Sequence, residues 1–153
     1  MIGDENNSGV YYLAIFSIII IGFSFITLMI DYFSTYTIKD TADAEFKRIV
    51  VNEMAKKLTD EYSSDYMAKF ENSDKTALEE VIKKEFVSKM KSEKGYDINI
   101  SLLEIQQPSV LTITFSLKGT CTFTPMIAKN FGSEFIFKLP IESKAKVIRF
   151  DEY

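Results

Sequence analysis

The fold of this chain is decided by the stretch Val10-Tyr-Tyr-Leu-Ala-Ile-Phe-Ser-Ile-Ile-Ile-Ile-Gly-Phe-Ser-Phe-Ile-Thr-Leu-Met-Ile30, which contains no charged residue. A helix of this length spans about 31 Å, which matches the hydrocarbon core of a bilayer. Because lipid offers no hydrogen-bond partners, a lone spanning segment has to be helical. Tyrosines lie near both ends of the stretch, where amphipathic rings favour the membrane interface. The sequence therefore predicts a transmembrane helix over residues 10–30.

A cleaved secretory signal is the main alternative for this segment. Such a signal has a basic start, an apolar stretch of about 7–15 residues and a cleavage site of small residues. Here residues 1–9 form a short polar leader with Asp4 and Glu5, and Thr27-Leu-Met-Ile-Asp31 is a poor cleavage site. We therefore expect an uncleaved anchor that makes the chain a single-pass protein of the cell membrane.

The helix is expected to continue beyond the membrane into a domain over residues 31–153. No proline precedes Pro108, and no glycine lies between Gly22 and Gly95. Apolar residues recur at helical steps of three and four. They are Tyr36, Phe46, Ile49, Val50, Met54, Leu58, Tyr62, Tyr66 and Phe70. We interpret them as a stripe that faces the core of the domain; a coiled-coil partner is the alternative.

A second amphipathic helix is predicted after Asn72-Ser73-Asp74, which is typical of a break followed by an N-cap. The apolar face of this helix comprises Leu78, Val81, Ile82, Phe86 and Met90. Acidic residues lie in its first turns and lysines at its end, which complements the helix dipole. Gly95 is placed to cap it.

Beyond Gly95 the apolar residues alternate with polar ones, as in half-buried antiparallel strands with one solvated face. The alternating runs are Ile98–Leu102, Leu111–Leu117 and Phe135–Ile141, the last continuing through Ala145 and Val147. Pro140 inside the third run predicts an edge strand or a bulge. The expected fold is therefore α+β: a long N-terminal helix, a second helix and a three- or four-stranded antiparallel sheet whose apolar face the helices cover.

The residue types offer little for chemistry. The chain has no histidine and one cysteine, so it lacks the commonest zinc ligands and general bases and cannot form an internal disulfide. Asp40 and Asp43 lie near one face of the long helix but lack the further oxygen ligands of a metal site. We expect Cys121 to be a small buried apolar side chain. We predict that the chain is not an enzyme and binds no cofactor or metal. We also predict that it binds no nucleic acid, because its net charge is −4 and it has no clustered basic surface.

A row of lysines lies on the solvated face of the third predicted strand, at Lys138, Lys144 and Lys146. Such a row can contact anionic lipid or an anionic polymer. It also discourages pairing at the sheet edge, which is the interpretation we favour.

Several short motifs follow one another in a recognisable order. Gly9 opens the apolar segment, Asp31-Tyr32 closes it, and Ala42, Ala44 and Arg48 come next. Phe123-Thr-Pro125, Gly132 and Asp151-Glu152 follow in the C-terminal half. In this order and spacing, spread over most of the chain, the sequence resembles the TadE-like pseudopilins of tight-adherence (Tad) pili.

The resemblance implies a pilin-like fold and a structural role in a Tad or type IV pilus-like appendage or secretion apparatus, serving adhesion, secretion or conjugation. It implies that a prepilin peptidase cuts after Gly9 and leaves Val10 as the first residue. It also implies contacts of the membrane segment with lipid and with other pilin subunits, at Ala14, Asp31 and Tyr32. Ala14 stands where the family usually has a Glu, and the usual basic residues before the glycine are missing. We therefore interpret the chain as a divergent minor pseudopilin.

Both the orientation of the domain and its function have an alternative. The bases near the segment, Lys39, Lys47 and Arg48, all follow it, which favours a cytoplasmic C-terminal domain. Pilin-like proteins have the opposite orientation, and we follow the family in expecting the domain outside the cytoplasm. The alternative function is a stand-alone, membrane-anchored interaction module or regulator that is not part of a pilus.

Overall fold

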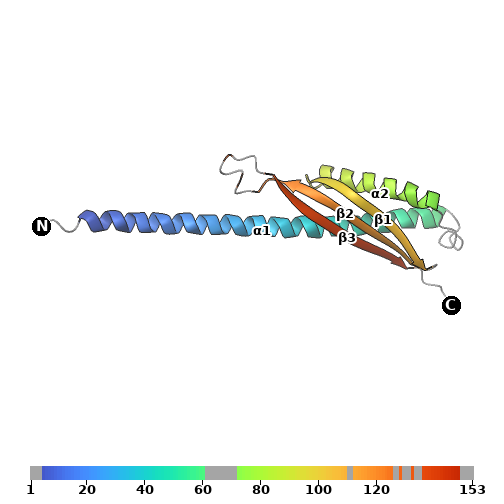
Figure 1. The fold of residues 1–153 in the computed structure, drawn as a ribbon, viewed down its shortest axis with the longest axis horizontal. Coiled ribbons are helices and arrows are strands. Elements are labelled where there is room, and N and C mark those ends of the chain that lie inside the picture. The colour runs from blue at the N-terminus through green and yellow to red at the C-terminus, as the bar shows by residue number, and fades with distance from the viewer. Residues whose placement is uncertain are drawn as a thin grey trace. The chain divides into compact units, whose positions relative to one another are not determined.

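The computed structural model describes residues 5–60, 72–109, 112–125, 128, 132 and 136–148, without the side chains of residues 5–8, 58–60, 72 and 73. Its elements are α1 (Glu5–Asp60), α2 (Asn72–Ser92), β1 (Asp97–Ser109), β2 (Thr112–Phe123) and β3 (Phe137–Ile148) (Figure 1). The predicted α+β fold is confirmed: a long helix, a second helix and, among the described residues, three antiparallel strands.

The chain divides into two compact units. The first unit comprises Met1–Tyr36 and Thr124–Phe135, and the second comprises Thr37–Phe123 and Ile136–Tyr153. Helix α1 therefore contributes its apolar first part to the first unit and its residues from Thr37 onward to the second.

The sheet belongs to the second unit and has the strand order β1-β2-β3, with both neighbouring pairs antiparallel. β3 is thus an edge strand, as Pro140 predicts, and Pro140 lies opposite Thr120 of the central strand. Proline is tolerated there because an edge strand has hydrogen-bonding partners on one side only. The inward positions of β2 include Ile113, Phe115 and Leu117, all buried as predicted.

A bulge in β1 changes which side chains face the core. The pairing with β2 shifts between Ile100 and Leu102, so Ser101 is an extra residue on β1. One extra residue reverses the alternation beyond it. Leu103 and Ile105 are therefore buried, whereas Leu102 is 45% exposed. The prediction that Leu102 lies on the apolar face is wrong for this reason.

Gly119 of β2 pairs with Ile100 of β1, the residue directly before the bulge. A Cβ at this position would lie 2.7 Å from the carbonyl oxygen of Asn99. The backbones of β1 and β2 approach so closely here that they leave no room for a side chain.

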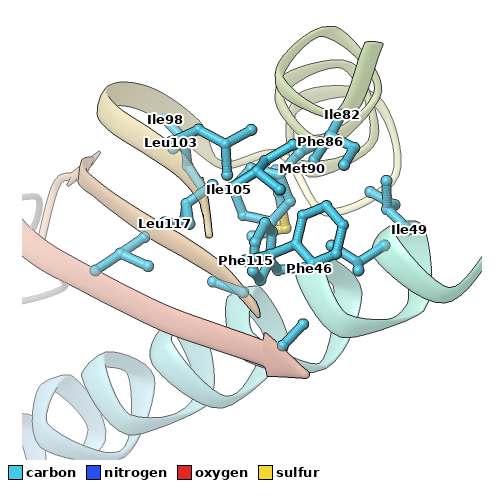
Figure 2. Packing of buried hydrophobic residues seen from close by; sticks show 14 of the residues in the cluster. Phe46, Ile49, Ile82, Phe86, Met90, Ile98, Leu103, Ile105, Phe115 and Leu117 are labelled. Carbon is cyan, nitrogen blue, oxygen red and sulfur yellow. The ribbon is translucent and has the colours of Figure 1, made fainter. Parts of the chain in front are cut away.

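The core of the second unit is one cluster to which α1, α2 and all three strands contribute. Figure 2 shows these side chains gathered between the helices and the sheet. The rings of Phe46 from α1 and Phe86 from α2 meet edge-on, with centroids 6.0 Å apart. Phe115 is fully buried on the central strand. The helices therefore cover the apolar face of the sheet, as expected (Figure 1).

The predicted stripe on the long helix is confirmed at Phe46, Ile49, Val50 and Met54, which are all buried. The prediction of Tyr36 as a core residue is wrong, since its side chain is 66% exposed and it belongs to the first unit. The core instead begins with Ile38 and Ala42, which lie two turns and one turn before Phe46, respectively. The remaining stripe positions, which are the side chain of Leu58 and the residues Tyr62, Tyr66 and Phe70, fall outside the described part of the chain.

On α2 the buried residues recur at steps of four, at Leu78, Ile82, Phe86 and Met90. Val81 was predicted on the same face but is 45% exposed. Successive residues turn by about 100°, so Val81 lies on the flank of this narrow stripe. Gly95 ends the helix as predicted: it adopts a φ of 71° and donates its N–H to the carbonyl of Lys91 at 3.2 Å.

Candidate functional site

The first unit presents a long apolar helix surface. Every large apolar side chain from Val10 to Ile30 is at least 40% exposed. In the most apolar 18-residue window of this helix, no residue is buried. Exposed apolar surface on this scale marks a site of interaction with lipid or with another protein. Among the described residues, one helix near the N-terminus is long and apolar enough to span a membrane.

The serine and threonine hydroxyls of this segment are satisfied within the helix. Each donates to the carbonyl oxygen of the residue four positions earlier: Ser17 to Leu13 at 2.8 Å, Ser24 to Ile20 at 2.9 Å and Thr27 to Phe23 at 2.8 Å. A helix in lipid has to satisfy its polar groups internally. The arrangement therefore removes the cost of placing these hydroxyls in hydrocarbon.

The residues predicted for processing lie inside α1. The helix begins at Glu5, so it includes the last part of the predicted polar leader as well as Gly9 and Val10. Val10 is exposed, and a Cβ built at Gly9 meets nothing within 4 Å. Ala14 lies one turn beyond Val10 and is also exposed. The Gly9–Ala14 stretch is thus an uncovered helix surface that a protease or a neighbouring helix can approach.

Asp31 and Tyr32 lie in the same helix, at the other end of the apolar run. The Asp31 side chain is half-buried, and its carbonyl accepts a hydrogen bond from the Thr35 hydroxyl at 3.0 Å. Tyr32 is exposed, and its ring meets that of Phe33 edge-on with centroids 6.0 Å apart. The helix rise separates Gly9 from Asp31 by about 33 Å, so the two groups of predicted residues mark opposite ends of a membrane-length span.

A polar clamp, formed by Asp43 and Ser143, lies in the second unit. Ser143 occupies an inward position of β3 and is only 3% exposed. Its hydroxyl donates to Oδ1 of Asp43 on α1 at 2.5 Å, and Oδ2 of Asp43 accepts from Nζ of Lys47 at 2.6 Å. Partial burial pushes the Asp43 pKa upward, but the hydrogen bonds from Lys47 and Ser143 and the charge of Lys47 outweigh it. The pKa of Asp43 therefore lies below its ordinary value.

A cavity of about 350 Å³ lies beside the clamp, lined by residues of α1, β2 and β3. Its wall includes the ion pair between Lys118 and Glu142, whose charged atoms are 3.6 Å apart. Because both oxygens of Asp43 already accept hydrogen bonds, the carboxylate serves to hold β3 against α1. In the part of the chain that the structure describes, no three His, Cys, Asp or Glu side chains gather as metal ligands.

The sequence placed Asp43 on one face of the long helix but did not indicate its partner Ser143. The available signal was Ser143 itself, a polar residue between Ile141 and Ala145 in a run of inward apolar positions. Cys121 is buried as expected, and desolvation, with a contribution from the charge of Asp97, raises the pKa of its thiol. Such a thiol is a packing residue with little thiolate character.

No family model, no curated protein and no solved structure matches this chain. The exposed apolar helix and the clamped α+β domain are therefore the features of this chain on which a function has to rest. The resemblance to TadE-like pseudopilins stays a prediction from the sequence motifs.

Proposed function

We propose that this protein is a minor pseudopilin-like structural subunit of a pilus-like surface appendage or secretion apparatus. The apolar part of α1 anchors it in the cell membrane as a single-pass protein. The observation that carries this proposal is the exposure of every large apolar side chain from Val10 to Ile30 in a helix whose serine and threonine hydroxyls are bonded internally. Such a surface suits contact with lipid or with the apolar helices of other subunits.

The second unit supports a structural role. From Thr37 onward, α1 packs with α2 against one face of the sheet, and the other face carries polar side chains that remain exposed or half-buried. A long helix that is apolar at first and then packs under a small antiparallel sheet is the plan of pilins. Its partners would be membrane lipid, other pilin or pseudopilin subunits and a prepilin peptidase.

The alternative proposal, a stand-alone membrane-anchored interaction module, is favoured by one residue. Ala14 stands where related pilins carry the carboxylate that meets a neighbour's new amine. A carboxylate inside the membrane costs a few kcal/mol unless it is paired, so its loss is tolerated where no amine has to be met. In the pseudopilin proposal, another subunit supplies that acid.

Sequencing the N-terminus of the protein purified from its own host distinguishes the two proposals. The pseudopilin proposal predicts chains that begin at Val10, and it predicts that Gly9→Leu blocks the cut while Gly22→Leu does not. Both substitutions add the same side chain to the same helix, at positions where a Cβ meets nothing within 4 Å. Recovery of only chains that begin at Met1, alongside correctly processed pilins of the same host, would favour the stand-alone module.

The orientation can be tested with an added cysteine. Ser92 is exposed at the end of α2, whereas the native Cys121 is buried and should not react. With Ser92→Cys, a membrane-impermeant maleimide should label intact spheroplasts if the domain lies outside the cytoplasm. Labelling that appears only after the cells are opened would place the domain in the cytoplasm, as the positions of the nearby basic residues suggest.

A further inference from the structure

The outer face of the sheet, which points away from the core cluster, has its charges sorted between the two edge strands. On β1 the charged residues are acidic, Asp97 and Glu104. On β3 they are three lysines and Glu142, which pairs with Lys118 of the central strand at 3.6 Å. All of these side chains are exposed. One edge of the sheet is therefore acidic and the opposite edge is basic.

The acids and lysines also lie in matching rows across the sheet. Asp97 pairs with Thr122, which pairs with Lys138, so the first acid and the first lysine share a row. In a second row, Glu104 pairs with Ser116, which pairs with Lys144.

The bulge preserves this match between the rows. Seven positions separate the acids and six separate the lysines, and Ser101 is the extra residue on β1. The spacing of the acids along the sheet therefore equals the spacing of the lysines.

The strand directions allow the matching edges of successive copies to face each other. β1 and β3 are each antiparallel to β2, so they run in the same direction. A second copy placed beside the first, in the same orientation, brings its β1 next to the first copy's β3. Asp97 of one copy then faces Lys138 of the other, and Glu104 faces Lys144.

We propose that copies of this chain associate head-to-tail, with the acidic β1 edge of one against the basic β3 edge of the next. The contact is heterologous, so it leaves one free edge of each kind and can continue along a row of copies. A row of lysines discourages the β3 edge from pairing with a neutral or basic strand. Acids in register with those lysines make the β1 edge of another copy the preferred partner. The bulge in β1 and Pro140 in β3 interrupt a continuous backbone ladder, which leaves the side chains to specify the contact.

The association is weak for free copies, because exposed ion pairs contribute little and salt screens them. Anchoring in one membrane raises the effective concentration of the edges and makes such a contact sufficient. In this respect the inference rests on the proposed membrane anchor, and its test records insertion separately.

The test uses the full chain in vesicles of neutral phosphatidylcholine, labelled through Ser92→Cys with a donor or an acceptor dye. Energy transfer between copies measures association, and vesicle flotation measures insertion. Lys144→Glu should weaken association on the order of tenfold, because a like charge then faces Glu104. Lys146→Glu is the matched control: it changes the same charge on the same strand, but its row ends at the neutral Gln106 on β1. Because the Gln106 amide donates to Glu104 at 2.7 Å, Lys146→Glu should have a smaller effect than Lys144→Glu rather than none.

The reciprocal variant Glu104→Lys should weaken association equally, and the double variant Glu104→Lys/Lys144→Glu should restore it. Mixing the two single variants should also restore transfer. At one contact between the variants the native Glu104 faces the native Lys144, and at the other the two introduced residues face each other with opposite charges. Equal effects of Lys144→Glu and Lys146→Glu, no effect of either, or no transfer at all in vesicles that carry the protein would overturn the proposal. Failure of the protein to float with the vesicles would instead contradict the membrane anchor.

Discussion

Replacing Ser143 with alanine removes the donor that joins the edge strand β3 to α1. The Ser143 hydroxyl is buried and lies 2.5 Å from Oδ1 of Asp43, so the hydrogen bond is short and its acceptor is charged. Hydrogen bonds to charged groups contribute about 1.5–3 kcal/mol. In this variant Asp43 keeps its ion pair with Lys47. The Asp43 side chain is 37% exposed, so water can replace part of the lost hydrogen bond. We therefore expect Ser143→Ala to lower the free energy of unfolding by about 1–2 kcal/mol at neutral pH.

The pH dependence of the stability difference shows whether the hydrogen bond to the ionised Asp43 carboxylate causes it. The folded-state pKa of Asp43 is depressed, so its ionised form contributes stability above its ordinary pKa of about 3.9. That contribution disappears as the pH falls through the folded-state pKa. Because Ser143 helps to depress this pKa, the stability difference between the unaltered protein and Ser143→Ala should be largest at neutral pH and shrink in acid.

Urea unfolding of a fragment of residues 37–153, followed by circular dichroism, measures this difference. The fragment begins at Thr37 because Ile38 belongs to the core. Ser116→Ala is the matched control, since Ser116 is half-buried on β2 beside the same cavity, and it should change stability by less than about 0.5 kcal/mol. If Ser143→Ala is as stable as the unaltered fragment at every pH, the clamp does not stabilise the domain.

Three further substitutions test the fold and the anchor. Phe115→Ala should lower the free energy of unfolding of the same fragment by about 3–5 kcal/mol, because it empties a fully buried site on the central strand. Gly119→Ala should cost about 1–3 kcal/mol in that assay, since its Cβ would meet a backbone oxygen at 2.7 Å; unchanged stability would mean that the bulge relaxes freely. Ile20→Arg should cost about 2.5–3.5 kcal/mol on insertion and lower the membrane-integrated fraction in a translocon assay, whereas Ile20→Leu should not.

Much of the fold follows from periodicity. The steps of three and four on both helices and the alternation on β2 predicted the core positions Phe46, Ile82, Phe86 and Phe115, all of which are buried. These predictions succeeded because each residue lies in the middle of a regular element, where the period of the backbone fixes the direction of the side chain.

The errors lie where the backbone or the packing departs from regularity. A bulge at Ser101 cannot be recognised from the alternation of apolar and polar residues. The prediction that Leu102 lies on the apolar face of the sheet is therefore wrong. Tyr36 continues the stripe of α1 in sequence, but the core does not extend that far. Periodicity shows which face of a helix is apolar, whereas the extent of the covered part depends on the partner elements.

The candidate site was predicted unevenly for a similar reason. The apolar span and the residues at its ends can be read from composition along one helix. The clamp between Asp43 and Ser143 joins residues one hundred positions apart, and only the pairing of β3 with the rest of the domain brings them together. The matched charge rows likewise depend on the strand register, including the bulge.

The central claim is that the apolar part of α1 holds the protein in a membrane. Alkaline carbonate extraction of membranes that contain the unaltered full chain tests it directly, with the fragment of residues 37–153 as the soluble control. We predict that the full chain remains in the membrane pellet while the fragment is found in the supernatant. Release of the full chain into the supernatant would contradict the claim.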